Sequence, residues 1–169
     1  TPLAEAMIGN IAQLPSIAEL CIGNIPGSIG ETSKIAILIG ALLLVFTRVA
    51  NLKIMLSVIA GGLTMGFIFN LIGTLPIMEI PAYQQLLMGG FLFGTVYMAT
   101  DPVTGPHTSQ GKILYGFLIG IFAILIRVAN KGYPEGMMLA ILLMNIFAPL
   151  IDYCVIQLNI RKRLRRNHA

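Results

Sequence analysis

Charged side chains are scarce in this chain of 169 residues. Only 11% of the residues are Asp, Glu, Lys or Arg, whereas ordinary soluble domains carry about 25%. Tryptophan is absent, 56% of the residues are hydrophobic, and the mean hydropathy is +0.85. So few charges cannot cover a water-exposed surface. The composition therefore excludes an ordinary soluble domain and favours a protein of the lipid bilayer.

Cysteine is also rare, and the net charge is small. The two cysteines, Cys21 and Cys154, lack CxxC spacing, which argues against a disulfide framework or a cysteine-bound metal, and both are expected to be structural. The formal net charge is +4. Five basic residues between Arg161 and Arg166 directly follow the last apolar stretch, as expected for a cytoplasmic tail. The basic balance therefore indicates membrane orientation and not a nucleic-acid partner.

Four apolar stretches have the composition of membrane helices. A span needs about 20 residues at 1.5 Å each. The four are Ile35–Thr47, which flanking Lys34 and Arg48 can lengthen by snorkelling, Ile54–Leu75, Ile113–Ala129 and Gly136–Leu158. A fifth stretch, Leu86–Ala99, offers only about 14 residues, which suits a half-helix or re-entrant segment as well as a span. We predict an all-α polytopic bundle of five transmembrane or partly re-entrant helices.

Five crossings predict three regions along the chain. Residues 1–34 form an outer, periplasmic segment, residues 35–158 the membrane domain, and residues 159–169 a basic cytoplasmic tail. Eight of the 11 Lys and Arg residues then lie inside, while Lys34, Arg127 and Lys131 lie outside. The chain begins with Thr1 and not with Met, so we expect it to be the C-terminal part of a longer protein.

The N-terminal segment contains a short repeat. "LAEAMIGNI" from Leu3 and "IAELCIGNI" from Ile17 match at six of nine positions. Each predicts a short amphipathic helix ended by a left-handed glycine, Gly9 or Gly23, lying along the outer membrane surface. Chance similarity between two turns is the alternative.

A glycine-rich turn, "NIPGSIGETSK" from Asn24, leads into a helix expected to begin near Thr32 or Ser33. Free backbone N–H groups before a helix start can bind an anion. Capping of the helix is the simpler interpretation.

Polar residues inside apolar segments are costly unless they are paired or line water. Asn70, Asn145 and Asp152 are of this kind, and Asp101 begins the polar break after the short segment. The predicted topology places both acids toward the cytoplasm, where oxygen ligands could take Na⁺ or relay protons. Residue types alone leave a structural role for the two acids equally open. In that alternative, Asp101 caps a turn and Asp152 pairs with the arginines of the tail. His107 and Lys112 are expected to face solvent.

Three longer motifs carry a family resemblance. "PGSIGETS", "YMATDPVTGP" and "YPEGMMLAILLMNIFAPLID" resemble the family that contains NqrB of the sodium-translocating NADH:quinone reductase and, more distantly, RnfD of the Rnf ferredoxin:NAD oxidoreductase. The resemblance covers essentially the whole chain and matches the C-terminal half of such a protein. "YPEGMMLAILL" and the tail "NIRKRLRR" favour the quinone-reductase member over the Rnf member.

The resemblance implies a multi-pass subunit of a bacterial inner-membrane complex with five other subunits. That complex oxidises NADH, reduces ubiquinone and pumps Na⁺. The implied fold is one half of a 5+5 inverted repeat similar to urea and ammonium channels. The alternatives are the Rnf member of the family and a cofactor-free channel or transporter repeat.

The family also implies where ligands bind. FMN is attached by a phosphoester to the threonine that ends an S-G-A-T motif, which matches Thr1 if its first three residues precede this chain. Gly27, Ser28, Gly30 and Thr32 then become a candidate cradle for the flavin phosphate. Asp101 and Asp152 match acidic residues of sodium uptake, not tight ligands. Riboflavin and ubiquinone are expected to be bound by the whole subunit, mostly through its N-terminal half, and are not placed on residues of this chain. No catalytic side chain is assigned here.

Overall fold

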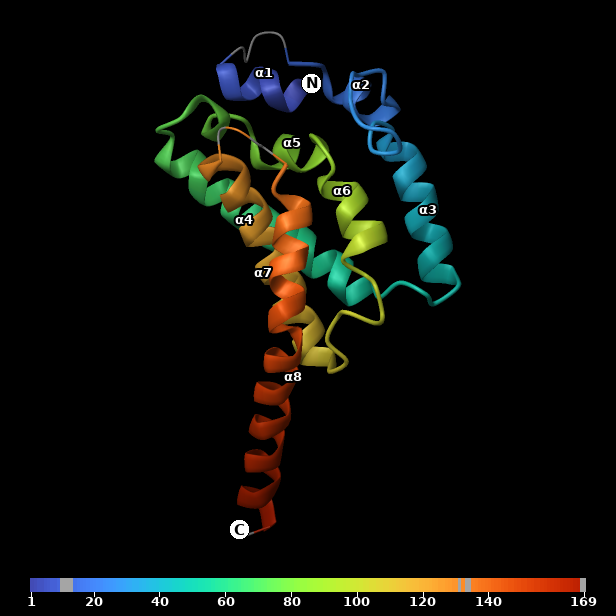
Figure 1. Cartoon of the computed structure of the whole chain (residues 1–169), viewed down its shortest axis with the longest axis vertical. Helices are drawn as coiled ribbons and strands as arrows, with labels where there is room; N and C mark the ends of the chain where they lie inside the picture. Colours follow the sequence, from blue (N-terminus) through green and yellow to red (C-terminus); the bar gives the residue numbers. More distant parts are fainter. Residues whose placement is uncertain (10–13, 131, 133–134, 168–169) are drawn as a thin grey trace.

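The computed structural model describes residues 1–9, 14–130, 132 and 135–167, with side chains described up to residue 164, and over this part the chain is helical without strands (Figure 1). Lys131 and the side chains of Arg165 and Arg166 lie outside the described part. The elements are α1 (Pro2–Ile8), α2 (Ile17–Ile22), α3 (Lys34–Phe46), α4 (Leu52–Ile72), η2 (Pro76–Met78), α5 (Ala82–Leu87), α6 (Phe91–Phe93), the π-helical turn η3 (Gly94–Met98), α7 (Ser109–Ala129) and α8 (Met137–Asn167).

Three of these helices are long and apolar enough to span a membrane. They are α4, α7 and the part of α8 from Met137 to Leu164. Helix α3 has only 13 residues, about 20 Å at 1.5 Å per residue. The five expected segments therefore appear as three long helices, one short helix and one broken segment. Helix α8 is longer than expected, because it contains Pro149 without ending there and continues past Leu158 into the basic tail.

The core of the bundle is the crossing of α4 and α7, made close by glycines. A Cβ on Gly120 would lie 2.5 Å from the backbone nitrogen of Gly62 and would also meet the carbonyl oxygen of Val58. A Cβ on Gly116 would lie 2.8 Å from the carbonyl oxygen of Ile54. Small residues four positions apart let helices approach closely in lipid, and Gly116 and Gly120 make this approach here.

The short apolar segment is a broken helix. Helix α5 ends at Leu87, Met88 is extended with ψ 144°, and Gly89 has φ +61°, after which α6 and η3 continue to Met98. Residues 73–81 form a return loop from α4 to α5. Asn70 in α4 holds this loop, because its side-chain amide nitrogen donates to the carbonyls of Met78 (2.5 Å) and Ile80 (2.7 Å). Of the two possibilities for this segment, the structure favours the half-helix.

Helices α1 and α2 cover one end of the bundle, and the C-terminus lies beyond the opposite end (Figure 1). We call these the N-terminal end and the C-terminal end. Both short helices were predicted, and both end as expected at left-handed glycines, Gly9 with φ 91° and Gly23 with φ 95°. Residues 10–13 between them lie outside the described part, including the last two residues of the first repeat copy. Leu3, Ala6 and Leu20 are buried against the return loop, so the N-terminal segment packs on the bundle.

Candidate functional site

Asp101 lies at the C-terminal end, in the loop that follows η3. Its carboxylate accepts hydrogen bonds from the Thr104 hydroxyl (2.8 Å) and from the backbone N–H groups of Val103 (3.2 Å) and Thr104 (3.3 Å). The Thr104 hydroxyl and the Val103 N–H hold the pKa of this carboxyl below its ordinary value. Asp101 therefore caps a turn as an ionised group, which is one of the two interpretations left open by the sequence.

Asp152 projects from α8 onto the same loop. Its carboxylate accepts from the backbone N–H of His107 (2.7 Å), the backbone N–H of Thr108 (3.0 Å) and the Thr108 hydroxyl (2.5 Å). The first tail arginine, Arg161, lies nine residues further along the helix, about 13 Å at 1.5 Å per residue. Asp152 thus ties α8 to the start of α7, whereas the sequence suggested the tail as its structural partner.

The two acids border neighbouring cavities. One cavity, about 210 Å³, is lined by Asp101, Lys112 and Arg48, and another, about 440 Å³, by Asp152 and Pro149. His107 lines both; it is exposed as expected, while Lys112 is half-buried. Within the described residues no group of three His, Cys, Asp or Glu side chains could hold a metal ion. The structure thus places both predicted residues around one loop, without a tight metal site.

At the N-terminal end, Thr1 borders a much smaller cavity. Thr1 is exposed, and its hydroxyl oxygen accepts a hydrogen bond from the backbone N–H of Ala4 (3.2 Å) at the start of α1. The adjacent cavity, about 20 Å³, is also lined by Gly27 and Thr32. Two other members of the expected phosphate cradle, Ser28 and Gly30, do not line it.

Polar groups of the glycine-rich turn form hydrogen bonds within the chain. The backbone N–H of Ser28 donates to the Glu31 carboxylate (3.2 Å), and the Ser33 hydroxyl accepts from the N–H of Ala36 (3.4 Å) and so caps α3. Capping, the simpler of the two interpretations, is confirmed. Contact between this turn and a flavin phosphate stays a prediction.

Two cations that the sequence placed at the outer surface are buried. Lys34 is 6% exposed and Arg127 is 1% exposed. The Lys34 ammonium donates to the carbonyls of Glu31 and Gly89, and the Arg127 guanidinium donates to those of Gln85 and Met88. A broken helix leaves carbonyls without intrahelical partners, and in apolar surroundings they need donors. The expectation that Lys34 snorkels was therefore wrong.

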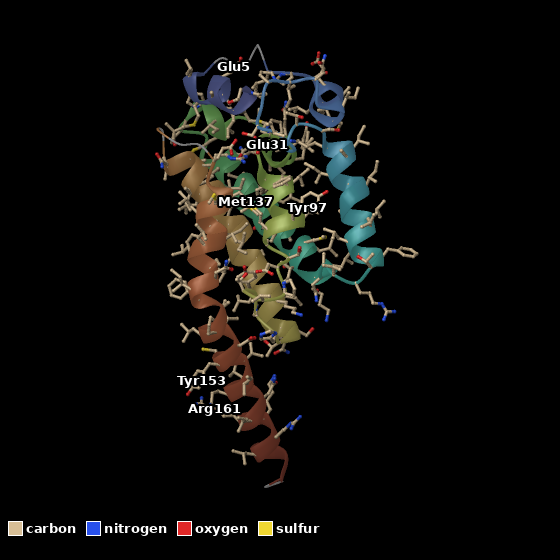
Figure 2. All side chains as sticks on the ribbon, turned by 45° about the vertical axis from the view of Figure 1, so that its right-hand side comes forward. Glu5, Glu31, Tyr97, Met137, Tyr153 and Arg161 are labelled. Carbon is tan, nitrogen blue, oxygen red and sulfur yellow. The ribbon has the colours of Figure 1, made fainter. Side chains whose placement is uncertain are left out.

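Two carboxyl groups complete this cluster, and sequence reasoning did not identify them. Figure 2 shows Glu31 between the N-terminal helices and the body of the bundle. The carboxyl groups of Glu31 and Glu135 both approach Gly90, and burial together with the Glu31 charge raises the pKa of Glu135. The available signal was Arg127 itself, an ionisable residue inside an apolar helix, which implies buried partners.

Comparisons with known proteins agree on one family. The sequence model of the NQR2, RnfD, RnfE family matches residues 1–161. The chain is 51% identical over 168 residues to NqrB, a subunit of the Na(+)-translocating NADH-quinone reductase, from Chromohalobacter salexigens, covering 98% of this chain and 41% of that protein. The protein of the same name from Klebsiella pneumoniae is 49% identical over 165 residues, which cover 96% of this chain and 40% of that protein. The one from Yersinia pestis is 53% identical over 147 residues, which cover 86% of this chain and 36% of that protein. The chain thus spans about two fifths of the length of these curated relatives.

Proposed function

The chain belongs to the NQR2, RnfD, RnfE family, and on that premise we propose that it is the C-terminal membrane part of NqrB in a sodium-translocating NADH:quinone reductase. In this role it carries covalently bound FMN in the electron path and contributes to Na⁺ translocation. The observation that carries the proposal is the identity of about half of all positions, along nearly the whole chain, with relatives that bear this name. The helical fold with three long apolar helices agrees with a multi-pass membrane protein.

Assembly and location follow from the same proposal. The partners are the other five subunits of the complex, ubiquinone and the lipid bilayer, and the location is the bacterial inner membrane. Residues 1–34 face the periplasm and the basic tail faces the cytoplasm. The described helices then form one half of a 5+5 inverted repeat, and the rest of NqrB, which riboflavin and ubiquinone also contact, supplies the other half.

Thr1 suits the attachment of a flavin through its phosphate, because its side chain is exposed and lies at the surface of the N-terminal end. The adjoining cavity of about 20 Å³ does not have room for the three fused rings of a flavin. The rings therefore lie outside this cavity, against the rest of NqrB or a partner. When bound, the flavin supplies the redox chemistry, and Thr1 supplies its position.

Flavin fluorescence on a denaturing gel tests this assignment. In the complete, matured complex we expect the gel band of this protein to fluoresce after denaturation, because a phosphoester survives unfolding, and we expect Thr1→Ala to lose the fluorescence. Thr74→Ala is the matched control, since this exposed threonine lies at the same end of the bundle but does not line the cavity beside Thr1. A non-fluorescent band in the matured, unmutated complex would contradict the proposal and favour a cofactor-free transporter repeat.

The Rnf relative is the second candidate, because the matching family includes RnfD. In that case electrons pass between ferredoxin and NAD. The named relatives described above favour the quinone reductase. Purification of the chain with its native partners distinguishes the two, because the complexes differ in their remaining subunits.

A further inference from the structure

Glu31 and Glu135 come together from distant parts of the chain. Glu31 lies in the turn before α3, and Glu135 lies just before α8. A Cβ on Gly90 would lie 2.5 Å from Oε2 of Glu31 and 3.7 Å from Oε2 of Glu135. The Glu31 carboxyl group therefore occupies the space that the missing side chain of Gly90 leaves open, and the Glu135 carboxyl group borders that space, beside the break between α5 and α6.

Two ionised carboxylates that approach the same glycine repel each other, and a proton shared between them removes this repulsion. An ionised carboxylate only accepts hydrogen bonds, so a carboxyl–carboxyl contact requires one of the groups to be protonated. One O–H then donates to the other, ionised group, and such charge-assisted bonds are short and strong. A proton shared in this way belongs to the pair and not to either residue alone.

The surroundings of the pair contain two fixed positive charges. Lys34 and Arg127 both interact electrostatically with Glu31 and Glu135, and the Cys21 thiol lies close enough to act on Lys34. With both carboxyl groups ionised, the four charges sum to zero, and with one shared proton they sum to +1. The cations favour release of the proton, while burial and the repulsion between the carboxylates favour its retention.

Two further observations point to a small polar ligand at this place. The cavity of about 20 Å³ between Glu31, Lys34 and Glu135 has room for one water molecule, which needs roughly 10–15 Å³ and two to four polar partners. The Nε–H of Arg127 is buried without a hydrogen-bond partner. The same guanidinium borders the pair, because a Cβ on Gly89 would lie 3.7 Å from Nη2 of Arg127 and 3.4 Å from Oε1 of Glu135.

We propose that Glu31 and Glu135 form a binding site for one exchangeable proton, shared between their carboxyl groups and reached through a water molecule in the adjoining cavity. The proton joins the turn before α3 to the start of α8, next to the broken helix. Both carboxyl groups are partly exposed, so the proton exchanges with the solution on this side. The site requires neither flavin nor sodium, so a test of the shared proton is independent of a test of the proposed function.

Infrared difference spectroscopy tests the site directly. The sample is the complete protein, purified in its native assembly and titrated from acidic to alkaline pH. We expect a protonated carboxyl band that shifts in D₂O and disappears at alkaline pH. Glu31→Gln and Glu135→Gln should each remove the band, because either substitution leaves the other carboxyl group with a neutral partner. Glu79→Gln is the control, since this carboxylate is exposed at the same end, and it should leave the band unchanged.

The outcomes separate the possibilities. Loss of the band in only one Gln variant would show an unshared proton, and persistence in both would show that the proton lies elsewhere; either result overturns the proposal. Gly90→Ala is an independent variant, because its methyl group would displace the Glu31 carboxyl without changing any titratable group. It should also remove the band, and a band that persists there would contradict the shared geometry.

Discussion

At the scale of single residues, Asp101 and Asp152 hold one loop at the C-terminal end from two sides. Asp101 binds residues that directly follow it, and Asp152 binds His107 and Thr108 from α8. Each carboxylate accepts three hydrogen bonds, which is ample reason for a structural role. A role in sodium uptake therefore has to be separated from the stability of the loop.

Substitutions of the two acids and of their hydroxyl partners can separate a role in sodium uptake from a role in loop stability. In the complete complex we expect Asp101→Ala and Asp152→Ala to weaken the stimulation of turnover by Na⁺ more than they weaken NADH oxidation, because both variants remove negative charge beside the cavities. Thr104→Ala and Thr108→Ala remove the hydroxyl partners and keep the carboxylates. Steady-state turnover against Na⁺ concentration is the measurement. An unchanged Na⁺ dependence in both Asp variants, or an equal effect in the Thr variants, would assign the acids to loop structure alone.

The pH dependence of the carboxyl pair has a definite sign. Burial raises the pKa of Glu135, so the folded protein holds its proton more tightly than the unfolded chain does. The resulting stabilisation is fully present below the unfolded pKa and is lost as the pH rises through the folded pKa.

Thermal unfolding against pH measures this loss. We expect the unmutated protein to lose stability relative to Glu135→Gln as the solution becomes alkaline, while Glu79→Gln follows the unmutated protein. Parallel pH curves for the unmutated protein and Glu135→Gln would show that the folded state holds no extra proton at this residue.

At the scale of elements, the contact between α4 and α7 depends on glycine in both helices. Gly120 faces the backbone of Gly61 and Gly62, so an added methyl group has no flexible side chain to displace. The helices would have to separate, and the crossing that organises the bundle would loosen. Contacts between backbones are what lipid favours, because apolar side chains gain little by leaving hydrocarbon for protein.

We expect Gly120→Ala to destabilise the folded protein by about 1–3 kcal/mol, the usual cost of overpacking a tight core. Leu114→Ala is the matched control, because this residue lies on the same helix with its side chain 47% exposed. The midpoint of thermal unfolding of the purified protein reports the difference. Equal midpoints for the two variants would mean that the helices adjust without cost.

At the scale of the whole molecule, the two ends of the bundle carry different groups. Thr1 and Glu31 lie at the end covered by α1 and α2 (Figures 1 and 2), while Asp101 and Asp152 hold the loop between η3 and α7 at the other end. In the proposed orientation these ends face the periplasm and the cytoplasm. The positive charge of the tail supports this direction.

Labelling of single cysteines tests the orientation. Ile29 and Val103 are 104% and 81% exposed, one near each end. With a membrane-impermeant thiol reagent on intact cells, Ile29→Cys should react at once, and Val103→Cys should react only after the inner membrane is opened. The native Cys21 and Cys154 are replaced by serine in both variants. Reaction of both positions from the same side would contradict an odd number of crossings.

Local chemistry made much of the fold predictable from the sequence. Gly9 and Gly23 end short helices because glycine tolerates the left-handed conformation, and apolar length identifies α4, α7 and most of α8. The buried cluster was not predictable in the same way. Glu31 and Glu135 lie more than 100 residues apart in the sequence, and only the tertiary fold brings them together. Lys34 and Arg127 resembled boundary cations, because the carbonyls that bind them belong to a break whose position the sequence left open.

The length of α8 has a mechanical consequence. Its 31 residues extend about 46 Å, some 16 Å more than the hydrocarbon core of a bilayer. With its headgroup layers a bilayer is about 40–45 Å thick, so a helix that crosses close to the membrane normal reaches from one headgroup layer through the other. The basic residues from Arg161 onward then lie at the depth of the lipid phosphates. Salt bridges to those phosphates would oppose any sliding of α8 along its own axis.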